Sequence, residues 1–67
     1  MPTLTDYQDD LARYTDEAEQ YRSRAELARR EHRRREAVAC ETSAAAREKM
    51  IATYLRIIAD MTREHDA

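Results

Sequence analysis

The chain contains no glycine, and its only proline is Pro2, so the residues that most often interrupt a helix are missing from position 3 onward. Charged residues make up 39% of the chain, a proportion that also suits a disordered segment. The apolar residues, however, recur at heptad spacing among strong helix formers. We therefore expect an all-α protein with a coiled-coil type of packing.

The first apolar stripe covers four heptads in the first half of the chain. Its two core positions hold Leu4, Leu11, Ala18 and Ala25, and Tyr7, Tyr14, Tyr21 and Ala28. This is the a/d pattern of a coiled coil. The stripe ends after Ala28, because the same frame would next place His32 and Arg35 in the seam.

A second stripe begins at Ala37 in a different frame. It holds Ala37, Ala44, Ile51 and Ile58 at one core position, with His65 next in frame, and Cys40, Arg47, Tyr54 and Met61 at the other. Arg47 is the irregular member, and we expect its stem to cover apolar surface while its head reaches water. The five-residue offset would turn the seam by roughly 140° on an unbroken helix.

A fold-back lets the two stripes face each other. We therefore predict one domain over residues 1–67, an antiparallel two-helix coiled-coil hairpin with helices at about 4–30 and 36–65 and a turn within 30–36. The register places Leu11 beside Tyr54 and Ala18 beside Arg47. It brings large residues together at the end with the termini and alanines near the turn, so the hairpin should taper toward the turn. Arg22 is expected to meet Glu41. The predicted hairpin core comprises Leu4, Tyr7, Leu11, Tyr14, Tyr21, Cys40, Ile51, Tyr54, Ile58 and Met61.

One alternative fold stays open, a single helix of about 60 residues pairing antiparallel with a second copy. Residues 30–36 contain no turn-favouring residue. The i,i+4 pairs Glu26–Arg30 and Glu31–Arg35 support helix through this segment. The helix start is also open, because Thr5 with Gln8 and Thr3 with Asp6 both fit a capping box.

The second helix is more apolar than a hairpin requires, and 67 residues with one cysteine supply little stability alone. We therefore predict a homodimer whose interface includes Met50, Leu55 and Ile57. Net charge is −5 over residues 1–20, +5 over 21–35 and −2 over 36–67. Opposite charges would meet if two hairpins packed head to tail in an antiparallel four-helix bundle.

The most concentrated polar feature lies at the predicted turn. It consists of Arg29, Arg30, Arg33, Arg34 and Arg35. Guanidinium groups suit phosphate or carboxylate contacts, and a solvated charged surface is the plain alternative. The leading functional hypothesis is a protein–protein interaction or regulatory module acting as a homodimer and docking on a larger protein. The alternatives are a nucleic-acid-binding dimer that uses these arginines, and a structural component of a larger assembly such as a phage particle.

Other chemistry finds little support in the sequence. We expect no catalytic residues, cofactor, metal site or small-molecule substrate. His32 and His65 lack the converging ligands of a zinc site. Cys40 lies between alanines of its stripe and is expected to be structural. The longest apolar run, residues 57–59, is too short to cross a bilayer, and the lone cysteine and polar start favour a cytoplasmic location without a membrane partner.

Overall fold

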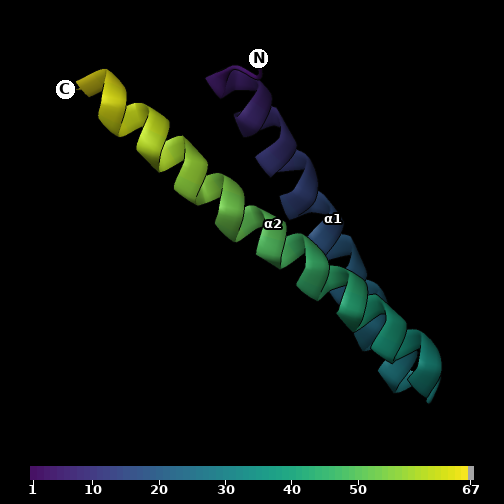
Figure 1. Ribbon diagram of the computed structural model, residues 1–67. Coiled ribbons are helices and arrows are strands. Elements are labelled where there is room, and N and C mark those ends of the chain that lie inside the picture. Colours follow the sequence, from purple (N-terminus) through teal and green to yellow (C-terminus); the bar gives the residue numbers. More distant parts are fainter. Residues whose placement is uncertain (67) are drawn as a thin grey trace.

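The chain folds back on itself as an antiparallel pair of helices. The computed structural model describes the backbone of residues 1–66 and the side chains of residues 1–64. Helices α1 (Leu4–Arg30) and α2 (Arg34–Asp66) lie side by side, with the N-terminus and the end of α2 at the same end of the molecule (Figure 1). The hairpin is 53 Å long. The predicted all-α hairpin is confirmed, and the chain does not form the single unbroken helix.

The first helix begins with a capping box. The Oγ1 of Thr3 accepts a hydrogen bond from the Asp6 N–H at 3.2 Å, and the Asp6 carboxylate accepts one from the Thr3 N–H at 2.9 Å. These bonds satisfy donors that a helix start otherwise leaves without a partner. Of the two starts compatible with the sequence, the structure uses Thr3 with Asp6, and Thr5 lies inside the first turn.

The turn between the helices is a Schellman motif built without glycine. The Arg33 N–H donates to the Ala28 carbonyl at 2.8 Å, and the His32 N–H donates to the Arg29 carbonyl at 3.1 Å. This pattern requires a left-handed residue after the helix, and His32 supplies it with φ 60°. The turn needs only three residues, so α2 begins at Arg34, two residues earlier than predicted.

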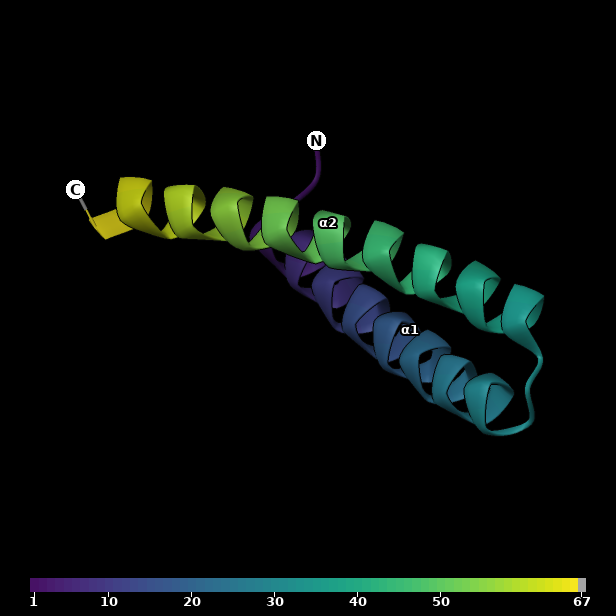
Figure 2. The same cartoon turned by 90° about the horizontal axis from the view of Figure 1, so that it is seen from below.

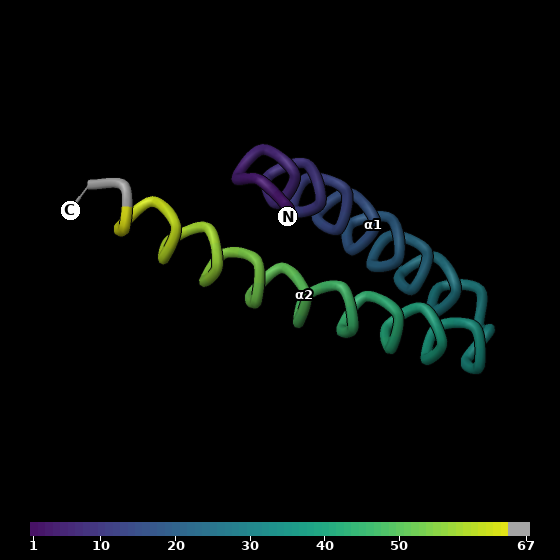
Figure 3. Tube along the Cα trace, turned by 45° about the horizontal axis from the view of Figure 1, so that its top comes forward, coloured from purple at the N-terminus to yellow at the C-terminus, as the bar shows by residue number. Residues whose placement is uncertain are grey.

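The two helices approach each other closely near the turn and diverge toward the termini (Figures 1 and 3). Viewed at 90° to Figure 1, α2 continues past the start of α1 (Figure 2). Alanine side chains allow close approach of helices, and larger side chains hold them apart. The buried residues are Ala18, Ala25, Ala28, Ala37, Cys40 and Ala44. All of them belong to the part of the hairpin nearer the turn, as the predicted taper requires.

Candidate functional site

The end of the hairpin that carries the termini, called the open end below, leaves its large apolar side chains partly exposed. Among the described residues, the only buried side chains are those of five alanines and one cysteine. Tyr21 lies nearer the middle of the hairpin and is also half-buried. The half-buried core residues of the open end are Leu4, Tyr7, Leu11, Tyr14, Ile51, Tyr54, Ile58 and Met61. The predicted core residues therefore line the seam, but apart from Cys40 a single hairpin does not bury them.

Three tyrosines form an aromatic cluster at the open end. The ring of Tyr54 lies 5.7 Å from that of Tyr7, at an interplanar angle of 55°, and 5.6 Å from that of Tyr14, at 27°. Tyr54 therefore sits between two successive core tyrosines of α1, as the register that places it beside Leu11 requires. Loss of solvent around its phenol raises the pKa of Tyr54 above its ordinary value, and Tyr14 and Asp10 raise it further.

Arg47 occupies its core position by making two contacts on α1. Its Nε donates to an Oε of Glu17 at 3.1 Å, and its guanidinium carbon lies 4.9 Å from the ring centroid of Tyr21. Both partners lie close to Ala18, the residue expected opposite Arg47. The expectation that its head simply reaches water was incomplete, because the head is paired and stacked against α1. An ion pair and a cation–π contact together make an arginine tolerable in the seam.

Ion pairs between the helices run along one flank of the seam, but the predicted pairing of Arg22 with Glu41 is wrong. Arg22 instead makes a bidentate contact with Glu48, at 2.8 and 3.0 Å, and Glu41 pairs with Arg29. Side chains lean toward the N-terminus of their own helix. The N-terminus of α1 is at the open end, so an α1 arginine leans toward that end. It therefore meets an α2 acid that lies seven residues closer to the open end than the residue that the register places opposite its Cα. Exposed pairs of this kind contribute about 0.2–1 kcal/mol each, so their main effect is on register.

The residues predicted for a dimer interface lie on α2 with substantial exposure. Leu55 is 53% exposed and Met50 is 37% exposed, while Ile57 is half-buried. At 100° per residue, Met50 and Ile57 lie on one side of the α2 seam and Leu55 lies on the other. The two sides flank the half-buried seam residues of the open end. Together they form a broad apolar face that one hairpin leaves uncovered.

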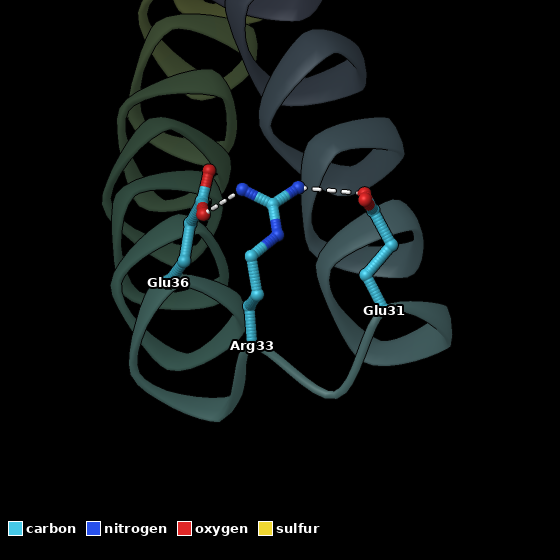
Figure 4. Close-up of polar contacts among 3 residues, drawn as sticks. All are labelled: Glu31, Arg33 and Glu36. Carbon is cyan, nitrogen blue, oxygen red and sulfur yellow. Dashed lines mark hydrogen bonds and ion pairs between the residues drawn. The ribbon is translucent and has the colours of Figure 1, made fainter.

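The tip of the hairpin, residues 29–36, contains five arginines that the structure sorts into two groups. Arg33 reaches across the turn between Glu31 on one side and Glu36 on the other (Figure 4). The hydrogen bond to Glu31 raises the pKa of Arg33 above its ordinary value. Arg29 pairs with Glu41. Among the described side chains, Arg30, Arg34 and Arg35 make no ion pair.

A small hollow opens at the tip beside the turn. It has a volume of about 170 Å³ and is lined by Arg29, His32 and Arg34. Each of the three side chains offers N–H donors, and no acidic or apolar side chain is among the lining residues. The sequence placed the five arginines on the turn. It did not identify His32 as a lining residue, because that role depends on the turn geometry.

Other candidate chemistry remains scattered over the surface. Within residues 1–64, no group of three or more histidine, cysteine, aspartate or glutamate side chains lies close enough to hold a metal ion. The acids Asp16 and Glu19 line a depression formed by side chains of α1 alone. Cys40 is a free, buried thiol. The side chain of His65 lies outside the described residues.

No known protein family model, curated protein or solved structure matches this chain. Along the described part of the chain, neither helix has a stretch long and apolar enough to cross a membrane.

Proposed function

We propose that the protein is a small non-enzymatic interaction module that acts as a helical homodimer and docks on, or regulates, a larger protein. The observation that carries this proposal is the composition of the buried core. Among the side chains of residues 1–64, the hairpin buries only alanines and a cysteine, while its tyrosines, isoleucines and methionines stay partly exposed. A partner is the simplest way to cover them.

The energetic reason is the size of the buried groups. Burying a methylene-sized group contributes about 0.8 kcal/mol, whereas fully burying a leucine or isoleucine side chain contributes about 1.5–3 kcal/mol. Fixing each backbone residue costs about 1–2 kcal/mol of conformational entropy. Burial of alanine side chains contributes little free energy to offset that cost. If a second copy of the chain covered the open end, and the first copy covered that of the second, the larger side chains of both copies would be buried.

Shape and charge favour a head-to-tail arrangement of the two copies. The hairpin is narrow at the tip and wide at the open end (Figure 1), so two tapered units fill space best when they point in opposite directions. The first twenty residues carry a net charge of −5, whereas residues 21–35 carry +5. The antiparallel four-helix bundle brings these ends together, while a parallel pair would place arginines beside arginines.

The mass of the protein in solution tests the homodimer. Sedimentation of the wild-type chain should give twice the chain mass, and the double variant Met50→Glu, Ile57→Glu should give monomers that are largely unfolded. Leu27→Glu is the matched control, because Leu27 is 51% exposed but lies on the face of α1 that points away from the seam. A monomeric, stably folded wild-type chain would refute the proposal.

The direction of packing needs a separate measurement. Val38 lies near the tip and is exposed, so a nitroxide attached to Val38→Cys in a Cys40→Ala background should not disturb the seam. Pulsed electron paramagnetic resonance then measures the distance between the two labels. A head-to-tail bundle predicts labels separated by much of the 53 Å hairpin length. Labels about one bundle width apart would indicate a parallel dimer.

A nucleic-acid-binding dimer using the same arginines is the second candidate. What favours it is the set of Arg30, Arg34 and Arg35, for which the described side chains provide no ion-pair partner. Against it, the other two tip arginines are engaged by glutamates of the same hairpin, and the tip contains no tyrosine for base stacking. Replacing Arg33, Arg34 and Arg35 with glutamine should abolish any salt-dependent binding of an oligonucleotide.

The remaining parts of the proposal concern the setting of the module. A structural role in a larger assembly, such as a phage particle, would use the same open end as a contact surface with other subunits. A cytoplasmic location fits a chain whose only cysteine is an unpaired thiol. Recovery of the protein only in purified particles, with no stoichiometric partner in a native extract, would favour the structural role.

A further inference from the structure

The geometry points to a binding site for a phosphate monoester in the hollow at the tip. The inference rests on the proposed docking to a larger protein, and it names the chemistry of the group that the tip would contact. The hollow is formed by residues of a single hairpin. The homodimer is tested by mass, so the two proposals can fail separately.

The first observation is the composition of the hollow. Arg29, His32 and Arg34 line a space of about 170 Å³. This volume is below the range of about 300–1,000 Å³ in which drug-sized ligands bind, and it suits a small compact group. Guanidinium groups bind phosphate oxygens in bidentate geometry through N–H donors, and the histidine adds another donor. The lining therefore selects a small anion with several oxygen acceptors.

The second observation is that each nearby acid is already bonded to an arginine of the same hairpin. Glu31 and Glu36 both bind Arg33, whose side chain lies across the turn between them (Figure 4). Glu41 binds Arg29 and so fixes a guanidinium at the edge of the hollow. Arg34 has no ion pair with any described side chain. The acids of the tip thus position the site without filling it, and Glu41 is a positioning residue for Arg29.

The third observation is the choice of residue at the left-handed position. The turn requires φ near 60° at position 32, and an L-residue in that conformation costs roughly 1–2 kcal/mol that glycine avoids. Histidine is present instead, and its imidazole contributes to the lining of the hollow. A residue that is unfavourable for the turn but supplies a donor to a cationic hollow is consistent with a binding role.

A phosphate monoester fits these observations better than a nucleic-acid backbone. The hollow is small and is lined by one arginine held by Glu41 and one arginine, Arg34, that has no ion pair with any described side chain. A phosphodiester backbone presents many phosphates of single charge, whereas a phosphomonoester carries close to two charges at neutral pH. One hollow per hairpin matches one dianion. A free phosphate ion and a phosphorylated side chain of a partner protein would supply the same group.

The test is a titration of the uniformly ¹⁵N-labelled full-length chain, followed by amide chemical shifts at constant ionic strength. The probes are inorganic phosphate, phosphoserine and a single-stranded oligonucleotide, each compared with chloride. We expect phosphate and phosphoserine to bind saturably, one per hairpin and in roughly the millimolar range. The largest shifts should fall on the amides of residues 32–36. Tighter binding of phosphoserine would indicate a phosphorylated partner, and equal binding would indicate the free ion.

Three variants locate the site. Arg34→Gln should weaken phosphate binding about tenfold, the usual effect of losing a charge-assisted hydrogen bond. His32→Gly should weaken binding while keeping the turn. Arg56→Gln is the matched control, because it removes the same charge from an exposed position on α2 outside the hollow, and binding should stay within about twofold.

Two results would overturn the inference. Equal losses of phosphate binding in Arg34→Gln and Arg56→Gln would mean that phosphate responds only to the total charge. Saturable binding of the oligonucleotide, with no saturable binding of phosphate or phosphoserine, would mean that the tip arginines bind nucleic acid and not a phosphate monoester.

Discussion

Replacement of His32 by glycine tests the turn directly, because the hairpin and an unbroken helix predict changes of opposite sign. In the hairpin, His32 is held at φ 60° and makes the left-handed step of the Schellman motif. Relief of that conformation contributes roughly 1–2 kcal/mol. Glycine also has greater conformational freedom in the unfolded chain, which lowers the free energy of unfolding by about 0.5–1 kcal/mol. His32→Gly should therefore raise the free energy of unfolding by about 0.5–1 kcal/mol.

The matched variant His32→Ala supplies the comparison. Alanine pays the same left-handed cost as histidine, so in the hairpin the glycine variant should be the more stable of the two. In an unbroken helix, glycine is about 1 kcal/mol less favourable than alanine, and the order reverses. The assay is urea denaturation followed by circular dichroism at one fixed protein concentration, because dimerisation would make stability depend on concentration.

The expected size of the effect is measurable by heat as well. For a domain of 60–100 residues, 1 kcal/mol shifts the melting temperature by roughly 4–8 °C, so the two variants should differ by about 4 °C. A glycine variant that is clearly less stable than the alanine variant would refute the left-handed turn. That result would favour the swapped long helix, which uses the same heptad register.

Further substitutions test the packing, the cap and the aromatic cluster. Ala44 is fully buried between the helices, so Ala44→Leu should lower the free energy of unfolding by about 1–3 kcal/mol in chemical denaturation. The matched change at the exposed position, Ala45→Leu, should alter it by less than about 0.5 kcal/mol. Equal effects of the two substitutions would contradict the close approach of the helices. Thr3→Ala should cost about 1 kcal/mol through loss of the capping box and Thr5→Ala much less, and the reverse order would place the cap at Thr5. The pKa of Tyr54 is raised in the folded state, so its contribution to stability is complete below the ordinary tyrosine pKa near 10 and is lost as pH rises through the folded value. Tyr54→Phe should therefore lose stability less steeply at alkaline pH, and identical pH profiles would show that burial does not affect this phenol.

The heptad frames predicted most of the fold because they encode which residues share a face. Both stripes were readable from spacing, and their offset predicted a fold-back although the segment between them lacks glycine. The contacts of Tyr54 with Tyr7 and Tyr14 agree with the register derived in this way. Periodicity is informative here because every position that faces the partner helix must be small or apolar.

The details that failed depend on side-chain direction and on backbone geometry. Arg22 pairs with Glu48 because side chains lean toward the N-terminus of their helix. A prediction that matches residues only by their backbone positions along the hairpin does not include this effect. Arg47 finds Glu17 and the ring of Tyr21 because α1 presents both beside Ala18. Neither contact can be predicted from a heptad pattern. The pattern assigns each residue to a face of the helix, but it does not give the direction in which the side chain extends or how far.

The candidate site shows the same division. The sequence placed five arginines at the turn, but it could not show that Arg29 and Arg33 are occupied by glutamates of the same hairpin. Nor could it identify the hollow beside His32, which exists only because a left-handed residue reverses the chain. Composition therefore predicted where positive charge gathers. Geometry decided which part of that charge has no partner within the described hairpin.

By itself, the sequence determined that the chain is helical, that its apolar stripe changes frame near its middle and that its alanines and large apolar residues separate along the seam. These properties follow from local preference and from the period of the apolar residues, both of which are written along the chain. Only the tertiary structure decided that the chain reverses and where, which charges pair across the seam and how little of the apolar surface one hairpin buries. Those outcomes depend on the distance between two helices, because contact, ion pairing and loss of solvent all require groups that are remote in sequence to meet in space.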